Sequence, residues 1–162
     1  MLVAVVSDTH MPRGARRFPD SCVERLRTAD LILHGGDLSA VAVLEELQAL
    51  GPPVHAVHGN ADEAALRELL PADLVVDAGG TRIGMTHDPG PAAGRKERLA
   101  RRFPGCPAVV FGHTHLPQVE RAGSVWLLNP GSPTERRRGP FHSMLLLEVE
   151  AGVISPRLVP LS

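Results

Sequence analysis

The sequence has few of the residues that mark several classes of protein. Tyrosine is absent, and only 3% of the 162 residues are aromatic, a scarcity that by itself indicates no function. Only two cysteines occur, Cys22 and Cys106, and they form neither a CxxC pair nor a disulfide framework. The cysteine content therefore excludes a disulfide-stabilised secreted domain and leads us to expect a reducing cytoplasm.

Long apolar runs and an excess of one charge are also missing. No apolar run reaches the ~20 residues that a membrane span needs. Residues 1–6 lack the basic region and the cleavage site of a signal peptide, so we expect a strand there. The formal net charge of -1 offers no electrostatic attraction for nucleic acid or an anionic membrane. We therefore expect neither a membrane nor a long nucleic acid as a partner.

The chain does contain enough apolar material for one folded domain. Hydrophobic residues make up 43% of the sequence and recur throughout it, which argues against a wholly disordered protein. No internal repeat, linker or low-complexity segment divides the chain. We therefore predict a single domain over residues 1–162, large enough to bury a core.

The first half of the chain alternates between predicted strands and predicted helices. Ser21 with Glu24 has the spacing of a capping box, and Ser39 and Asp62 are predicted to cap the next two helices. We predict strands at 2–6, 31–33 and 54–57, and helices after Ser21, from Ser39 to Leu50 and at 63–70. This alternation is typical of parallel βαβ units.

The second half is predicted to contain mainly antiparallel strands. Gly79-Gly80 separates two apolar segments and predicts a hairpin. A helix is predicted at 95–103, and strands at 74–76, 82–85, 108–111, 119–121, 125–128, 144–149 and 153–159. Parallel units followed by antiparallel strands predict an α/β (α+β) fold with mixed sheets and with helices outside them.

Side chains that commonly bind metals follow five of the predicted strands. In open α/β sheets, functional sites form at the carboxyl ends of the strands. Asp8 and His10 are spaced i and i+2, as are His113 and His115, so in extended backbone each pair would point the same way. Carboxylate, imidazole and amide ligands suit Mn, Fe, Co, Ni or Zn. The seven candidate ligands are Asp8, His10, Asp37, Asn60, His87, His113 and His115.

Each candidate ligand also has an ordinary structural explanation. Asp8 and Asp37 could cap loops or helices, and Asn60 could be a turn residue next to Gly59. Taken singly, each residue favours the structural explanation. Taken together, five groups at successive strand ends favour a metal site, in which glycines before Asp37, Asn60 and His113 permit close approach of the backbone.

The remaining histidines and one basic run are predicted to lie outside the set of ligands. His34, His55 and His58 lie within or beside strands, so hydrogen-bonded positions in the core or behind the ligands are favoured. His142 is predicted to be exposed in a loop. Arg136–Arg138 is predicted to be a solvated loop, with a substrate phosphate or a subunit contact as alternatives.

Six motifs occur along the chain in a fixed order: Asp8-Thr9-His10, Gly36-Asp37, Gly59-Asn60-Ala61-Asp62, Thr86-His87, Gly112-His113-Thr114-His115 and Asn129-Pro130-Gly131-Ser132. The series resembles the calcineurin-like metallophosphoesterases, and most of all the small bacterial and archaeal phosphodiesterases of the YfcE type. The resemblance covers nearly the whole chain. It implies a four-layer sandwich of two mixed β-sheets flanked by helices.

The resemblance also implies a site for two metal ions. The first ion would be held by Asp8, His10, Asp37 and His115, and the second by Asp37, Asn60, His87 and His113. Asp37 would bridge ions about 3.5–4 Å apart, and a bridging hydroxide would attack phosphorus. Asp37, Asn60 and His113 would be the catalytic residues. Mn is the first choice of metal, with Ni, Co, Fe or Zn as alternatives, and the implied substrate is a small phosphodiester or a nucleotide-like molecule.

Two positions depart from the family pattern. Many members have a histidine after the Gly-Asn pair, where it contacts the phosphate or assists the leaving group, but this chain has Ala61. YfcE-type members usually have cysteine there. The fourth motif often continues with Gly-His, whereas here His87 precedes Asp88. We therefore expect a different substrate entrance and a preference for diesters whose leaving group is acidic.

Two other functions remain as alternatives. The retromer subunit of the same fold works mainly through protein contacts, so a non-catalytic metal-binding scaffold is one of them. All seven positions carry competent ligands, which favours an enzyme. A metal-dependent nuclease is the other, although the lack of a basic patch argues against a long polynucleotide substrate. The resemblance also leads us to expect a homodimer or a higher homo-oligomer.

Overall fold

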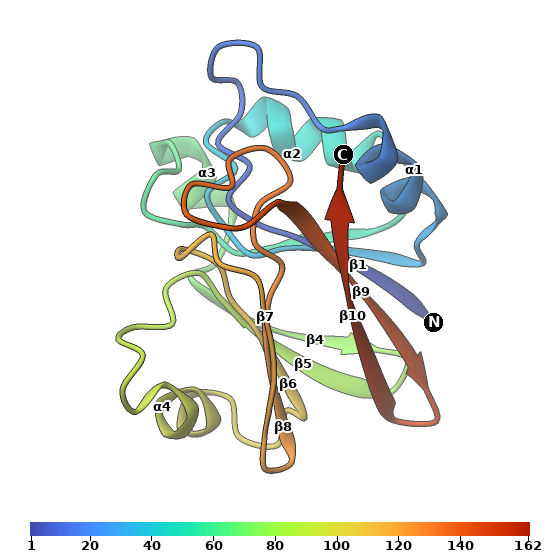
Figure 1. The fold of residues 1–162 in the computed structure, drawn as a ribbon, viewed down its shortest axis with the longest axis vertical. Helices are drawn as coiled ribbons and strands as arrows, with labels where there is room; N and C mark the ends of the chain where they lie inside the picture. Colours follow the sequence, from blue (N-terminus) through green and yellow to red (C-terminus); the bar gives the residue numbers. More distant parts are fainter.

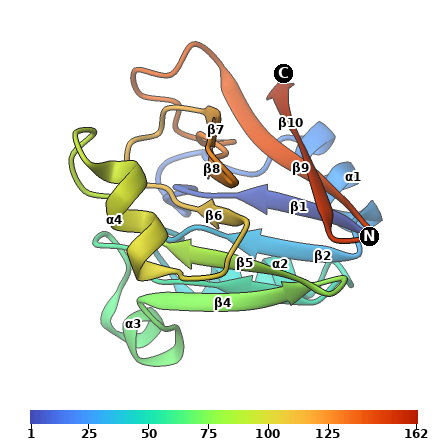
Figure 2. The same cartoon turned by 90° about the horizontal axis from the view of Figure 1, so that it is seen from below.

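The computed structural model describes residues 1–162, and its centre is a pair of five-stranded mixed β-sheets (Figures 1 and 2). The first sheet contains β1 (Leu2–Val6), β2 (Leu31–His34), β3 (Val54–Ala56), β9 (His142–Glu150) and β10 (Val153–Leu161). Its strand order is β10-β9-β1-β2-β3, with β1, β2 and β3 parallel. Val6 pairs with His34, so β1 and β2 end side by side.

The second sheet lies against the first. It contains β4 (Asp73–Ala78), β5 (Thr81–Thr86), β6 (Ala108–Val110), β7 (Gln118–Ala122) and β8 (Val125–Asn129). Its strand order is β4-β5-β6-β8-β7, with β5, β6 and β8 parallel and both edge strands antiparallel to their neighbours. The predicted hairpin between β4 and β5 turns at Gly79 and Gly80, which both have positive φ.

Four helices cover the outer faces: α1 (Asp20–Thr28), α2 (Val41–Gln48), α3 (Ala64–Leu69) and α4 (Arg95–Arg102). Figure 1 shows α1 and α2 at the top, beyond the first sheet, and α4 at the lower left, beside the second. The predicted sandwich of two mixed sheets flanked by helices is therefore confirmed. No helix combines the length and the apolarity needed to cross a membrane.

Alternating side chains along β1 contribute to two layers of the core. Ala4 and Val6 pack with Leu47 of α2 on the outer side of the first sheet. Val3 and Val5 belong to the cluster that fills the space between the sheets. Successive residues of a strand face opposite sides, so one short strand serves both layers. A third cluster joins α4 to the outer face of the second sheet.

The helices agree with the sequence prediction, but the predicted caps are wrong. The residues before α1, α2 and α3 are Pro19, Ala40 and Glu63, and none forms a side-chain capping hydrogen bond. Ser21 lies inside α1, and the hydroxyls of Ser21 and Ser39 have no hydrogen-bond partner. Burial of an apolar face stabilises such short helices more than local capping does.

Histidines outside the predicted ligands vary in their environment. His34 is buried in β2, where its ring accepts a hydrogen bond from Gly36 N and donates one to Thr9 Oγ1. The prediction of a core or supporting position is wrong for His55, because β3 is an edge strand and leaves this side chain exposed. The predicted exposure of His142 is also wrong, because it begins β9 and is half-buried.

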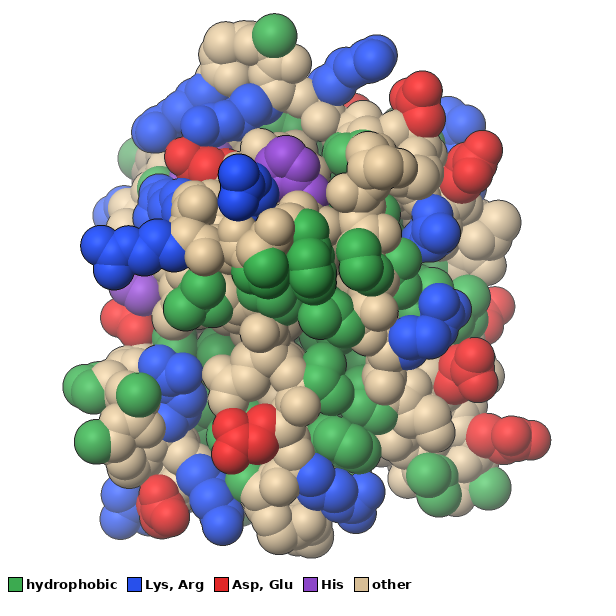
Figure 3. All heavy atoms as spheres, in the orientation of Figure 1, with side chains coloured by type: hydrophobic (Ala, Val, Ile, Leu, Met, Phe, Trp, Pro, Cys, Tyr) green, Lys and Arg blue, Asp and Glu red, His purple; other side chains and the backbone are tan.

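The edge strands β7 and β10 contact each other on one side of the molecule. Val119 of β7 and Val153 of β10 are exposed. Figure 3 shows hydrophobic side chains along the middle of one face, with basic and acidic side chains around them. Charges of both signs therefore surround an apolar strip on this face.

Leu33 tests the importance of the core between the sheets, because it is fully buried there. We expect Leu33→Ala to lower the free energy of unfolding by about 2–5 kcal/mol, since it leaves a cavity that the sheets cannot fill. Urea denaturation with a chelator present would measure the loss. Leu69→Ala, at a side chain that is 62% exposed, is the control and should change stability by less than about 0.5 kcal/mol. Similar losses of stability in both variants would contradict the placement of Leu33 in the core between the sheets.

Candidate metal centre

The loops after five strands meet at one edge of the sandwich. They bring together Asp8 and His10 after β1, Asp37 after β2, Asn60 after β3, His87 after β5, and His113 and His115 after β6. The first sheet thus supplies the carboxylates and the amide, and the second sheet supplies most of the imidazoles. All seven predicted ligands lie in this one region, in contact or linked through one another.

Most of these residues have a backbone conformation that side chains seldom adopt. Five of them have φ between 47° and 68°: Asp8, His10, Asp37, His113 and His115. Such left-handed residues are uncommon, and they are concentrated at functional sites. The prediction that the i and i+2 pairs lie in extended backbone is therefore wrong. The pairs lie in tight turns beyond the strands, and these turns aim the side chains inward.

Three glycines allow the loops to approach the site closely. A Cβ on Gly36 would lie 2.6 Å from His87 Nδ1, and a Cβ on Gly59 would overlap the carboxylate of Asp37. Only a residue without a side chain fits at these two positions. A Cβ on Gly112, before His113, would likewise lie 2.6 Å from Asp8 Oδ2. The predicted role of the glycines before Asp37, Asn60 and His113 is therefore confirmed.

The first group of ligands, Asp8, His10 and His115, is buried. The Nε2 atoms of His10 and His115 are 3.2 Å apart. Asp8 Oδ1 lies 3.4 Å from His115 Nε2 and 3.9 Å from His10 Nε2. Atoms that bind one ion at ~2.0–2.2 Å have comparable separations, so this arrangement fits a single divalent cation.

The second group shares a carboxylate with the first and opens to solvent. Asp37 Oδ2 lies 3.2 Å from His87 Nε2 and 3.6 Å from His10 Nε2, so it stands between the two groups. Asn60 Oδ1 is 3.1 Å from His113 Nδ1, and the rings of His113 and His87 meet edge to face at 5.3 Å. Asn60 and His113 are exposed, so a substrate can reach this group.

Backbone carbonyls determine which nitrogen of two rings can bind an ion. His87 Nδ1 donates to the carbonyl of Gly35 at 2.8 Å, and His115 Nδ1 donates to that of Glu135. In each neutral ring, the lone pair is therefore on Nε2, which faces the site. His87 Nε2 is buried without a hydrogen-bond partner beside an oxygen of Asp37. A cation between these atoms would satisfy both, so the side chains fit divalent metal ions.

Electrostatics within the site favour positive charge beside the carboxylates. Burial raises the pKa of Asp8 to about 7. Burial also disfavours a charged His87, but the nearby Asp37 and Asp8 outweigh it and raise the pKa of His87 to about 9. Burial opposes ionisation of Asp37, yet His87 outweighs this effect and the pKa of Asp37 is lowered to about 2. A proton on His87 thus provides part of the charge that a metal ion would supply.

Asp62 organises the loops and does not cap a helix. Its Oδ2 accepts hydrogen bonds from Gly59 N at 2.7 Å and from Asp37 N at 3.1 Å, and its Oδ1 accepts one from Ser39 N at 2.7 Å. The predicted cap is wrong because the carboxylate points away from α3 toward these amides. One buried side chain therefore joins the loop of Asp37 to the loop of Asn60.

Further side chains form hydrogen bonds with the loops that carry the candidate ligands. Ser7 Oγ donates to Asp8 Oδ2 at 2.7 Å, and Ser132 Oγ donates to the carbonyl of Asp8 at 2.8 Å. Asn129 Nδ2 donates to the carbonyl of Gly112 at 3.0 Å. These contacts explain the motif at 129–132, which holds the backbone next to two of the candidate ligands.

Glu135 was not predicted from the sequence. Its Oε2 lies 3.6 Å from His10 Nε2, and its Oε1 accepts a hydrogen bond from Arg16 at 2.9 Å. The neighbouring Arg136–Arg138 run is exposed, as expected for a solvated loop. No spacing signal identifies Glu135, because the loop between β8 and β9 carries it to the site from a distant part of the chain.

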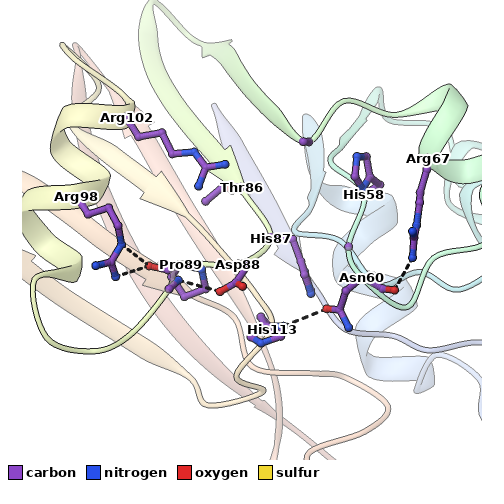
Figure 4. Close-up of a pocket in the computed structure, with 13 residues that line it drawn as sticks. His58, Asn60, Arg67, Thr86, His87, Asp88, Pro89, Arg98, Arg102 and His113 are labelled. Carbon is purple, nitrogen blue, oxygen red and sulfur yellow. Dashed lines mark hydrogen bonds between the residues drawn. The ribbon is translucent and has the colours of Figure 1, made fainter.

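A cavity of about 540 Å³ lies beside the second group of ligands (Figure 4). Its lining includes Asn60, His87, His113, Arg67, Arg98 and Arg102. The exposed side of the candidate metal centre therefore forms part of the wall of a pocket large enough for a small molecule.

Comparison with known proteins agrees with this geometry. Residues 1–152 match the family model of the calcineurin-like phosphoesterase superfamily domain. The chain belongs to this superfamily. A probable metallophosphoesterase of Methanothermobacter thermautotrophicus is 36% identical, with 85% of this chain and 80% of the relative covered. Another, from Methanocaldococcus jannaschii, is 34% identical, with 99% and 82% covered. The family expected from the motifs is confirmed, and membership implies binding of divalent metals.

A solved structure supports the same fold. Wild-type Vps29 of Entamoeba histolytica complexed with Zn²⁺ superposes with a TM-score of 0.78 and 26% identity, and the match covers 99% of both chains. This similarity extends over both sheets and all the loops that carry the candidate ligands. The metallophosphoesterase-like architecture is therefore shared along the whole chain.

Metal binding should depend on pH, because the ion must displace protons from His87 and Asp8. Their pKa values of about 9 and about 7 mean that His87 is protonated through neutral pH and that Asp8 gains its proton below 7. We expect the apparent affinity for Mn²⁺ to rise about tenfold per pH unit between pH 7 and 8, and more steeply between pH 6 and 7. Calorimetry in buffers of different ionisation enthalpy would measure the released protons. A constant affinity from pH 6 to 8 would contradict this electrostatic description.

Asp62 should matter for metal affinity although it contacts no ion. Asp62→Ala leaves three amides without their acceptor and releases the loops of Asp37 and Asn60. We expect about a 10–100-fold loss of metal affinity, the usual effect of removing a group behind the ligands. Asp77→Ala, at an exposed site in the β4–β5 hairpin, is the control. Unchanged affinity in a folded Asp62→Ala variant would show that the loops hold their positions without this carboxylate.

Proposed function

We propose that the protein hydrolyses phosphodiesters at a centre for two divalent metal ions. The observation that supports this most directly is the position of Asp37 Oδ2 between the imidazoles of His10 and His87. A shared carboxylate between two sets of nitrogen ligands is the arrangement expected of a two-metal site. Mn is the first choice of ion, with Ni, Co, Fe or Zn as alternatives suited to the same ligands.

The proposed ligand sets follow the two groups seen in the structure. The buried ion would be held by Asp8, His10, Asp37 and His115. The ion next to the cavity would be held by Asp37, Asn60, His87 and His113. Asp8 Oδ1 lies within 4.0 Å of His87 Nε2 as well, so both carboxylates lie close to the boundary between the sets.

The residues of the chain have distinct parts in the proposed reaction. When bound, the two ions would activate a water molecule and neutralise charge on the phosphate. Asp37 is held in place by the amide of Ala61, which donates to its Oδ1 at 2.8 Å. Asn60 and His113 are exposed beside the cavity, so an entering phosphate meets these side chains first. No protein nucleophile is required.

Two features favour a diester over a monoester. Ala61 offers only a methyl group where a histidine could protonate a leaving oxygen, so the best substrates are those whose leaving alcohol is acidic. A diester also brings less negative charge than a monoester dianion to Asp8 and Asp37. The natural substrate on this proposal is a small phosphodiester or a nucleotide-like molecule.

The similarity to Vps29 supports a second candidate function, a metal-binding scaffold that does not catalyse. The two functions differ in whether a substrate must reach the ions. A scaffold binds its ions without admitting a substrate, whereas an enzyme must leave them accessible to one. The exposed Asn60 and His113 beside the cavity therefore favour the enzyme.

Hydrolysis of paired aryl substrates tests the proposal. We expect protein reconstituted with Mn²⁺ to cleave bis(p-nitrophenyl) phosphate with a higher kcat/KM than p-nitrophenyl phosphate. Asp37→Asn should lower this activity more than about 100-fold, because it removes the shared charge, while Asp77→Asn in the distant hairpin should not. Elemental analysis should approach two ions per chain. If the protein binds Mn, Ni, Co, Fe or Zn but hydrolyses neither ester with any of these metals, the result would favour the scaffold.

A further inference from the structure

The cavity beside the candidate metal centre has a composition that the metal ligands do not explain. Three arginines, Arg67, Arg98 and Arg102, contribute to its wall, and Asp88 is the one carboxylate among the lining residues. Ala72 is a small residue, and no Phe or Trp side chain lines the cavity. The wall is therefore lined mainly by polar and charged residues, has more basic than acidic side chains, and lacks a large aromatic side chain.

Arg67 carries a charge that no carboxylate compensates. Its Nε donates to the carbonyl of Asp62 at 3.0 Å, and its Nη2 donates to that of Asn60 at 2.6 Å. These contacts fix the guanidinium beside a candidate ligand but leave its Nη1 without a protein partner. A guanidinium has five N–H donors, so Arg67 retains donors for a bound anion.

On the α4 side of the cavity, Arg98 adds positive charge and Arg102 adds N–H donors. Arg98 donates to backbone carbonyls of the loop after β5, including Pro89 at 2.7 Å and Pro91 at 2.6 Å, and it has no acidic partner. Arg102 forms a two-point ion pair with Asp73 at 2.6 and 2.7 Å, through Nε and Nη2. Its Nη1 remains free. Guanidinium groups with free donors are well suited to carboxylates and phosphates.

Figure 4 shows where these groups stand relative to the metal centre. Arg102 approaches from α4 on one side and Arg67 from α3 on the other, and His87 and His113 lie between them. A substrate whose phosphate reaches His113 would therefore extend the rest of its structure between the two arginines. The cavity has a volume of about 540 Å³, which suits a compact organic group.

We propose that this cavity binds a second anionic group of the substrate, a carboxylate or phosphate carried on an aliphatic or polyol chain. The proposal rests on the proposed phosphodiesterase function and narrows its substrate class. Recognition of a nucleobase often relies on stacking against the large rings of Phe, Tyr or Trp, and none of these side chains lines this wall. The charge of the wall favours a substrate with negative charge beyond the scissile phosphate.

Direct binding of phosphonates tests the proposal without any catalytic step. Protein reconstituted with Mn²⁺ is titrated by calorimetry with two sets of ligands. The short set is propylphosphonate, 3-phosphonopropionate and 3-aminopropylphosphonate, and the long set is hexylphosphonate and 6-phosphonohexanoate. Within each set the phosphonate group stays the same and only the charge of the group at the other end of the chain changes. We expect at least one carboxylate to bind about tenfold more tightly than its alkyl analogue, since a charge-assisted contact to guanidinium is gained. The ammonium compound should bind most weakly.

Variants separate recognition from structural effects. Arg102→Ala should remove most of the preference for the carboxylate, while affinity for the alkyl phosphonate changes little. Arg67→Ala also frees the Asn60 loop, so it should weaken binding of both ligands but weaken binding of the carboxylate more. Arg101→Ala is the matched control, because this exposed arginine of α4 does not line the cavity. An equal loss of affinity for all ligands in Arg67→Ala would mean that Arg67 only holds Asn60 in place, which would overturn the proposal.

Two outcomes distinguish this proposal from the function on which it rests. If the carboxylates bind no more tightly than the alkyl compounds at either chain length, the anionic pocket is refuted, whatever the rate of hydrolysis of bis(p-nitrophenyl) phosphate. If phosphonates bind with the expected preference but no ester is hydrolysed, the pocket stands as an anion site and the catalytic function fails.

Discussion

The burial of two carboxylates, Asp8 and Asp37, at neighbouring strand ends is the constraint on which the rest of the site depends. Like charges in a buried site are costly unless positive charge lies beside them. The chain supplies His87 beside both, and the raised pKa of this imidazole shows that the site favours a cation there. A divalent ion compensates these charges better than a single proton does. The electrostatic requirement of these buried carboxylates therefore coincides with that of phosphate chemistry, because the same ions would balance the carboxylates and attract an anionic substrate.

The fold holds these charges together through backbone hydrogen bonds and through a few buried side chains. Asp8 N donates to the carbonyl of Gly36 at 2.9 Å, and His10 N donates to that of Asp37 at 3.0 Å, so the loops after β1 and β2 are joined beyond the strands. The second sheet is attached through a buried side chain, because His113 N donates to the carboxylate of Asp8 at 3.1 Å. Left-handed residues are tolerated in these loops because the hydrogen bonds on either side fix them. Rigidity in the loops is thus a consequence of the parallel strands of both sheets ending at one edge.

Sequence patterns predicted the elements that depend on burial and failed for those that depend on tertiary hydrogen bonds. Apolar runs such as Leu31–Leu33 predicted the strands because the same side chains fill both faces of a sheet. The order of the motifs predicted which residues the structure gathers. Asp62 was assigned to a helix cap because local spacing is all that the sequence shows, whereas its partners lie up to 25 residues away. Glu135 left no signal, since it approaches His10 from a loop near the other end of the chain.

The position of Arg67 connects substrate recognition to the metal centre. This side chain bonds the carbonyl of Asn60 and lines the cavity, so it contacts the loop of a candidate ligand and the space for the substrate at once. Binding energy from a distant part of a substrate can serve the reaction when it improves the position of the reacting groups. An anion held by Arg67 would oppose withdrawal of the guanidinium from the Asn60 loop and would keep that ligand in place while the substrate is bound. On the proposed binding mode, a compact anionic substituent would therefore favour the arrangement of Asn60 and His113 in which the phosphate meets the metal site.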